Sequence, residues 1–119
     1  MRLNMLAKKY RLTKRGSFAY VYKKGEAVRG RCISLIYVKG KDLPRIGLSV
    51  GNKVGHAVVR NKIKRRMRAV IGAVIGRIKP CQAVFAVKSD SGELSFEFVQ
   101  TEITALLKRS GLIEDAKEE

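Results

Sequence analysis

A run of cations in the middle of the chain carries the side chains that could do chemistry. Residues 60–68 contain six Lys and Arg together with one Asn. Arg can bind phosphate through two parallel hydrogen bonds, Lys acts as a point charge, and an Asn amide can bind a ribose hydroxyl or a base edge. The run therefore predicts RNA binding rather than catalysis. The predicted RNA-binding residues are Arg60, Asn61, Lys62, Lys64, Arg65 and Arg68.

Helical spacing would gather these cations on one surface. At about 100° per residue, Arg60, Lys64 and Arg68 stack at i, i+4 and i+8. Asn61 and Arg65 extend the same polar face. Like charges at this spacing repel and destabilise an isolated helix, so a fold that keeps them together favours an anionic partner. A merely solvated basic face is the competing interpretation.

The other helices follow from apolar periodicity and capping residues. The helix that holds the cations is predicted over residues 57–78, because Pro80 cannot continue it. Its apolar face comprises Val59, Ile63, Met67, Val70 and Val74. A helix over 14–24 would begin at Thr13 and end at Gly25, with Phe18, Val21 and Tyr22 on one face, and a last helix over 95–109 would begin at Ser95 and end at Gly111.

Strands are predicted between these helices. Residues 26–31 are expected to form an edge strand or turn, and 31–39 and 45–50 are expected to form a hairpin. A glycine-flanked loop follows at 51–55, another strand at 82–88 and a loop at 89–92. The order α-β-β-β-α-β-α is typical of an α/β (α+β) two-layer sandwich with a sheet of about four strands.

Positive charge is concentrated in the first part of the chain. The net charge is +16, and 20 of the 26 Lys and Arg lie in residues 1–68, against two acids. Such a field attracts nucleic acid first and an anionic membrane surface second, and solubility alone needs less charge. Without a membrane-length apolar run or a secretion signal, we expect one soluble, cytoplasmic domain over 1–119, flexible at 1–12 and 111–119.

The sequence offers little for catalysis or metal binding. Cys32 and Cys81 belong to no Cys/His cluster, so we expect two reduced thiols and no zinc. Glu26 and Asp42 are the only acids before Arg77. A nuclease needs groups that hold a metal or activate water, so no catalytic and no metal-binding residue is predicted. Further cations suited to phosphate contact are Arg11, Arg45 and Lys53.

Two segments carry a family resemblance. Residues 47–65 read GLSVGNKVGHAVVRNKIKR, and residues 18–25 read FAYVYKKG. The first closely resembles the signature of the bacterial ribonuclease P protein, whose central helix carries the RNR motif, and the second resembles that family's aromatic first helix. Lys62 stands where the family usually has Arg, and Gly51-Asn52 replaces the usual Ser-Lys. The resemblance extends over roughly residues 10–109.

The resemblance implies a division of labour. A large RNA would perform Mg²⁺-dependent removal of the 5′ leader from precursor tRNA, while the protein binds no cofactor and assists without any protein partner. The RNR-motif helix would contact that ribonuclease P RNA. A cleft between the first helix and the sheet would hold the leader, lined by Phe18, Tyr22 and Tyr37. The family also implies a left-handed crossover around the central helix, against the usual right-handed rule.

Other functions stay open at this point. A ribosomal-type or chaperone-like RNA binder would bind many RNAs with similar salt sensitivity and give no gain in leader cleavage. A DNA-binding module would insert the basic helix into the major groove, although a readout helix usually carries more varied side chains. Aromatics on one face of a helix also often belong only to a core.

Overall fold

Four strands form one mixed sheet in the order β1-β2-β4-β3. The computed structural model describes residues 6–88, 92 and 94–113. The strands are β1 (Glu26–Arg29), β2 (Ile33–Lys39), β3 (Arg45–Val50) and β4 (Cys81–Val87), and the helices are α1 (Arg15–Lys24), α2 (Ala57–Val74) and α3 (Phe96–Ser110). Short 3₁₀ turns lie at Lys8–Tyr10, Asn52–Val54 and Ile75–Arg77. The predicted order of elements is confirmed, but α2 ends at Val74 instead of the predicted residue 78, because the chain continues as the 3₁₀ turn Ile75–Arg77.

The pairing of the strands differs from the predicted hairpin. β2 pairs with β1 and with β4, both antiparallel, while β3 pairs in parallel with β4. The hairpin expected between 31–39 and 45–50 is therefore wrong, because β4 lies between those two strands. The physical reason is that Ala83, Val84 and Phe85 are all fully buried, so β4 needs cover on both faces and takes a central place.

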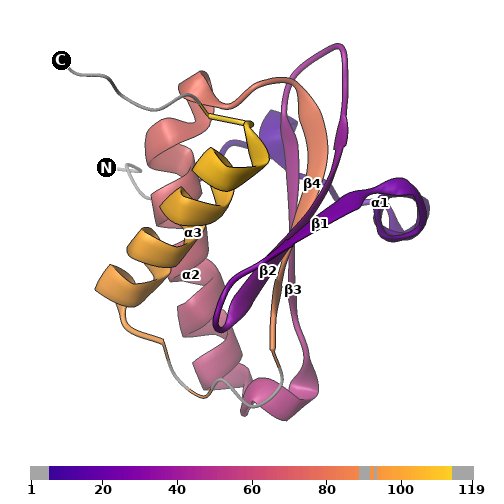
Figure 1. Cartoon of the computed structure of the whole chain (residues 1–119). Coiled ribbons are helices and arrows are strands. Elements are labelled where there is room, and N and C mark those ends of the chain that lie inside the picture. Colours follow the sequence, from indigo (N-terminus) through magenta and orange to yellow (C-terminus); the bar gives the residue numbers. More distant parts are fainter. Residues whose placement is uncertain (1–5, 89–91, 93, 114–119) are drawn as a thin grey trace, which may run out of the picture.

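The connection from β3 through α2 to β4 is a left-handed crossover. Figure 1 shows the sheet nearly edge-on, with β1 and β2 toward the viewer and α2 to the left. The chain descends along β3, rises along α2 and descends again along β4, which lies between β3 and β2. This hand is rare among parallel crossovers, and it sets the face of the sheet on which α2 lies.

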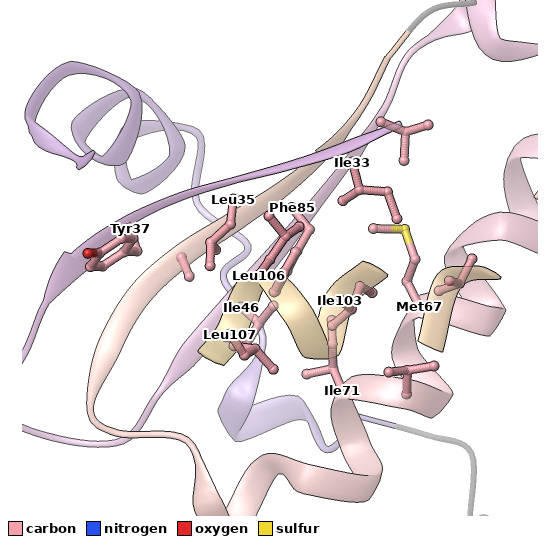
Figure 2. Packing of buried hydrophobic residues seen from close by; sticks show 14 of the residues in the cluster. Ile33, Leu35, Tyr37, Ile46, Met67, Ile71, Phe85, Ile103, Leu106 and Leu107 are labelled. Atoms are coloured by element: carbon pink, nitrogen blue, oxygen red, sulfur yellow. The ribbon is translucent and has the colours of Figure 1, made fainter. Parts of the chain in front are cut away.

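Helices cover both faces of the sheet. α2 and α3 pack together on one face, over a core that includes Ile33, Leu35, Ile46, Phe85 and Leu106 (Figures 1 and 2). α1 lies on the other face, where Val21 packs with Leu12 and Val84. The α/β sandwich is thus confirmed, with the short α1 added as a partial layer on the far side.

Local contacts explain where the helices begin and end. Ser95 Oγ accepts the backbone N–H of Phe98 at 3.1 Å, and Gly111 ends α3 with a φ of 81°, as predicted. The Thr13 cap is wrong, because Lys14 occupies the capping position of α1 with extended backbone and no side-chain hydrogen bond. On α3, Glu102 Oε2 accepts the backbone N–H groups of Cys32 and Ile33 at 2.6 and 2.7 Å, which ties this helix to β2.

Both terminal segments pack on the fold where the structure describes them. Leu6 is 2% exposed, and the Leu12 N–H donates to the Ile46 carbonyl at 2.9 Å. Leu112 and Ile113 are buried as well. The expected flexibility of 1–12 and 111–119 does not hold for these parts, since their apolar side chains complete the core. Residues 1–5 and 114–119, and residues 89–91 of the expected loop, lie outside the described residues.

Candidate nucleic-acid interface

The cations of α2 lie on two sides of the helix rather than on one face. Its core stripe is narrow: Ile63, Met67, Val70 and Ile71 are buried. Two pockets border the remaining surface, and different cations line each. We call Lys64 and Arg68 the β3 flank, and Lys62, Arg65 and Arg66 the α3 flank. Arg60 and Asn61 belong to neither pocket; Arg60 Nε donates to the Gly55 carbonyl at 3.1 Å and so holds the glycine loop.

The β3 flank borders a pocket of about 180 Å³ at the edge of β3. The residues lining it are Leu6, Arg11, Leu12, Thr13, Phe18, Ile46, Gly47, Leu48, Lys64 and Arg68. Three cations from two distant segments thus meet at one hollow. Their charges have no acid beside them in the lining, so the pocket attracts an anion.

Arg11 is the cation that the N-terminal segment brings to this pocket. Its backbone forms a parallel bridge with Ile46, and its Nε donates to the Leu6 carbonyl at 2.8 Å. Burial, and then the positive charge of Arg11, lower the pKa of Arg68 from its ordinary value. A bound phosphate between the two guanidinium groups would relieve that repulsion.

Phe18 forms the wall of the same pocket on the side of α1. Its ring lies against Gly47, where an added Cβ would come within 2.5 Å of Phe18 Cζ. The ring also packs on the small core of Leu12, Val21 and Val84. Phe18 is therefore a core residue with one surface left to the pocket, which combines the two roles considered for it. Tyr22, four residues on, is 48% exposed.

Tyr37 does not line a cleft with Phe18 and Tyr22, and that part of the prediction is wrong. Side chains alternate along a strand, and Tyr37 shares the core side of β2 with Ile33 and Leu35, opposite α1 (Figure 2). It is 7% exposed, and its hydroxyl bonds to Glu26 Oε1 at 3.1 Å and to the Ser110 carbonyl at 3.3 Å. Burial first, and then Glu26, raise the pKa of Tyr37.

The residues that face α1 instead were missed by the sequence reasoning. Ile36, on the opposite side of β2 from Tyr37, packs on the core under α1. Beside it the register aligns Ser34, Ala86 and Ser49 across three strands, all half-buried. This row offers a flat, small-residue floor next to α1. Only the strand register reveals it, because the predicted hairpin would have paired the wrong strands.

The structure separates the remaining predicted phosphate contacts. Lys53 is exposed in the turn Asn52–Val54, directly before α2. Arg45 begins β3 at its opposite end, pairs with Asp42 at 4.0 Å, and lies by alternation on the α1 side of the sheet. Lys53 therefore extends the α2 surface, whereas Arg45 is not brought to it.

The α3 flank borders a second pocket, of about 220 Å³, which the sequence reasoning also missed. Lys62, Arg65, Arg66, Ala69 and Phe96 line it. Phe96 is 40% exposed at the first position of α3, and Arg66 Nη1 donates to the Leu94 carbonyl beside it. The available signal was an aromatic residue placed after the Ser95 cap but outside the apolar set of that helix.

Groups suited to other chemistry are few in the part of the chain that the structure describes. No cluster of three or more His, Cys, Asp or Glu that could hold a metal occurs among these residues. Cys32 and Cys81 are not joined in a disulfide, and burial raises the pKa of the Cys81 thiol to about 12, so Cys81 is not a nucleophile near neutral pH. No described helix is long and apolar enough to cross a membrane.

Comparisons with known proteins agree with one another. The family model described as Ribonuclease P matches residues 6–111. The "Ribonuclease P protein component" of Syntrophomonas wolfei is 34% identical over 110 residues, covering 91% of this chain and 92% of that one. The protein of that name from Shouchella clausii is 33% identical over 111 residues, with 91% of each chain covered.

Solved structures give the same result. The RNase P protein of Staphylococcus aureus superposes with a TM-score of 0.82 at 28% identity, covering 88% of this chain and 98% of that chain. The RNase P protein of Thermotoga maritima superposes with a TM-score of 0.74 at 30% identity, covering 88% and 98%. The range matched by the family model includes the sheet, α1 and the basic helix, and the chain belongs to the ribonuclease P protein family.

Proposed function

We propose that this chain is the protein component of ribonuclease P, the endoribonuclease that matures the 5′ ends of tRNA. It binds the enzyme's RNA through α2 and holds the 5′ leader of precursor tRNA beside α1. The observation that carries this proposal is the meeting of Arg11, Lys64 and Arg68 with the Phe18 ring around one pocket. Cations bind the backbone of RNA, and an aromatic ring stacks on an unpaired base with little sequence preference.

The leader would continue from this pocket across the sheet. The row Ser34, Ala86 and Ser49 lies on the same face of the sheet as α1, and small side chains allow a nucleic-acid strand to lie close to the sheet. Tyr22 is exposed on α1, the helix that lies on that face. These features support leader binding by Phe18, Tyr22 and the small row, without Tyr37.

Hydrolysis is assigned to the RNA in this proposal. Mg²⁺ bound by the RNA would supply the metal chemistry there. The α2 surface is rich in cations, which repel a divalent ion and instead offset the charge of the RNA backbone. The protein's own role is to bind and orient. We place this activity in the cytoplasm, with the RNA as the sole required partner.

The test is cleavage of precursor tRNA by a bacterial ribonuclease P RNA at low Mg²⁺, with and without the protein. We expect the wild type to raise the cleavage rate, and the Lys64→Ala/Arg68→Ala variant to bind the RNA about a hundredfold more weakly, since two charged phosphate contacts are lost. Lys79→Ala/Lys108→Ala removes the same charge from exposed positions outside both pockets and serves as the control.

Two outcomes would contradict the proposal. A folded wild-type protein that gives no gain in cleavage while binding many unrelated RNAs would identify a general RNA binder. Equal losses in the two double variants would show that net charge, and not the β3 flank, determines binding.

A further inference from the structure

We propose that the pocket between α2 and α3 is a second RNA site, which takes one unpaired nucleotide. Its base would stack on Phe96, and its phosphate would lie between Lys62 and Arg65. This inference rests on the proposed function, because it assumes that the partner of α2 is RNA. It goes beyond that function by adding an aromatic contact on the side of α2 turned away from α1.

The pocket is built for a small, planar, anionic ligand. Its volume of about 220 Å³ is below the roughly 300–1,000 Å³ of pockets that enclose a complete small molecule. One wall is an aromatic ring and the others are cationic side chains, with Ala69 leaving room at the floor. A single nucleotide of a larger RNA presents the matching features, a flat base and a phosphate.

The fold does not account for the exposure of Phe96. Phe98, two residues later, packs on the core, whereas Phe96 keeps 40% of its surface in solvent. A lone exposed aromatic is ordinary on a protein surface. This one lies in a pocket with three cations, and that combination is typical of sites that bind single-stranded nucleic acid.

The start of α3, which carries Phe96, is held in place before any ligand binds. Leu94, in the segment before α3, is buried, and its carbonyl accepts a hydrogen bond from Arg66 Nη1 on α2. Ser95 caps the helix directly before Phe96. Arg66 is thus a positioning residue for the start of α3, and Lys62 and Arg65, both exposed, are the cations left to meet a phosphate.

The charge of the pocket favours RNA over a protein segment. None of the residues that line it is acidic, so a peptide ligand would have to supply both an acid and a flat group at the correct spacing. Every unpaired nucleotide carries both. The pocket also lies on the same helix as the β3 flank, so one RNA can reach both sides of α2.

The absence of Trp from the chain gives a direct test. Phe96→Trp introduces a single fluorophore at the site, and Tyr20→Trp introduces a matched one at another exposed aromatic position, on α1. On titration with bacterial ribonuclease P RNA alone, we expect stacking to quench the emission of the Phe96→Trp protein, with a midpoint equal to the binding constant. The emission of the Tyr20→Trp protein should stay nearly constant. Equal emission changes in the two variants would show that the RNA does not stack specifically at position 96, and the inference would be wrong.

Affinity gives the second readout. Phe96→Leu should weaken binding of that RNA about tenfold, the size of one lost base stack, while Phe96→Tyr should bind like the wild type. If the wild type stimulates cleavage and Phe96→Leu binds with unchanged affinity, this inference is wrong and the proposed function stands. If the wild type does not stimulate cleavage, the proposed function is wrong, and the inference that rests on it is wrong as well. Quenching by an acidic peptide but not by RNA would assign the pocket to a protein partner and overturn the inference.

Discussion

The two flanks of α2 use similar cations in different surroundings. On the β3 flank, Arg68 is partly buried beside Arg11, and the aromatic wall, Phe18, belongs to a core. On the α3 flank, Lys62 and Arg65 are exposed, and the aromatic ring of Phe96 stands in solvent. The first flank is therefore the more buried of the two. In our proposals it would fix the position of an RNA backbone, and the more open second flank would take a base.

If both proposals hold, one helix serves two parts of the same RNA. A core stripe of four buried residues leaves most of the circumference of α2 to cations. The neighbours of the helix then decide what each side binds: β3 and the N-terminal segment on one side, α3 on the other. The largest test of this view is whether the two flanks act independently.

Substituting the cations of both flanks together should weaken RNA binding more than any other change. We expect Lys64→Ala/Arg68→Ala and Lys62→Ala/Arg65→Ala each to reduce the slope of log affinity against log salt by about two, and the fourfold variant by about four. The free-energy losses should add, because separate sites are usually independent. Binding of ribonuclease P RNA between low and moderate salt measures both quantities. If the variant with all four substitutions bound the RNA as tightly as either double variant, the two flanks would form a single shared site.

Gly47→Ala should damage the β3 flank alone. The new methyl group would meet the Phe18 ring, so we expect a loss of about 1–3 kcal/mol in the free energy of unfolding, together with weaker binding of precursor tRNA. Gly51→Ala is the matched control, because a Cβ there meets nothing within 4 Å. Urea unfolding measures the first effect. Quenching in the Phe96→Trp background should not change, and a change there would couple the two flanks.

Arg66→Ala and Arg65→Ala should distinguish a residue of the α3 flank that stabilises the fold from one that binds RNA. Arg66→Ala removes the hydrogen bond to the Leu94 carbonyl and should lower the free energy of unfolding by about 1 kcal/mol. Arg65→Ala should leave stability unchanged and weaken RNA binding. Thermal melts and RNA titrations of the two proteins distinguish these effects, and the reverse pattern would reassign the two residues.

Sulfate should stabilise the free protein through the β3 flank. An anion that binds between Arg11 and Arg68 offsets their repulsion, so we expect the Tm to rise by about 4 °C at saturating sulfate, equivalent to about 1 kcal/mol. Arg68→Gln should show a clearly smaller rise, and it corrects for the general effect of sulfate on folding. Equal rises in the two proteins would exclude a specific anion site on this flank.

The sequence predicted what depends on local pattern. The Ser95 cap, the Gly111 stop and three residues of the α2 stripe, Ile63, Met67 and Val70, are set by residues a few positions apart. The predicted stripe omitted the buried Ile71 and included Val59 and Val74, which are only partly buried. The pairing partner of β3 is not set by nearby residues. That partner, β4, lies more than thirty residues away along the chain and takes its central place because it is buried on both faces. The predicted hairpin failed for that reason, and the left-handed crossover came from the family resemblance alone.

The site residues likewise divide into those that local spacing predicts and those that depend on tertiary contacts. Helical spacing identified Lys64 and Arg68, but it could not show that Arg11 would join them, because that contact depends on the pairing of the N-terminal segment with Ile46. Tyr37 was placed in the cleft through the family resemblance, whereas its alternation with Leu35 along the strand puts it on the core side of the sheet. Phe96 was missed because its role depends on how α3 packs against α2.

Acetylation of lysines in the free and RNA-bound protein shows whether α2 is the surface that binds the RNA. Lys64 and Lys62 report on the two flanks of α2, and Lys79 and Lys108 are exposed lysines outside both pockets. With bacterial ribonuclease P RNA bound, mass spectrometry should show strong protection of Lys62 and Lys64 and little protection of Lys79 and Lys108. If Lys62 and Lys64 react as fast as the other two in the complex, α2 does not bind the RNA and the account is contradicted.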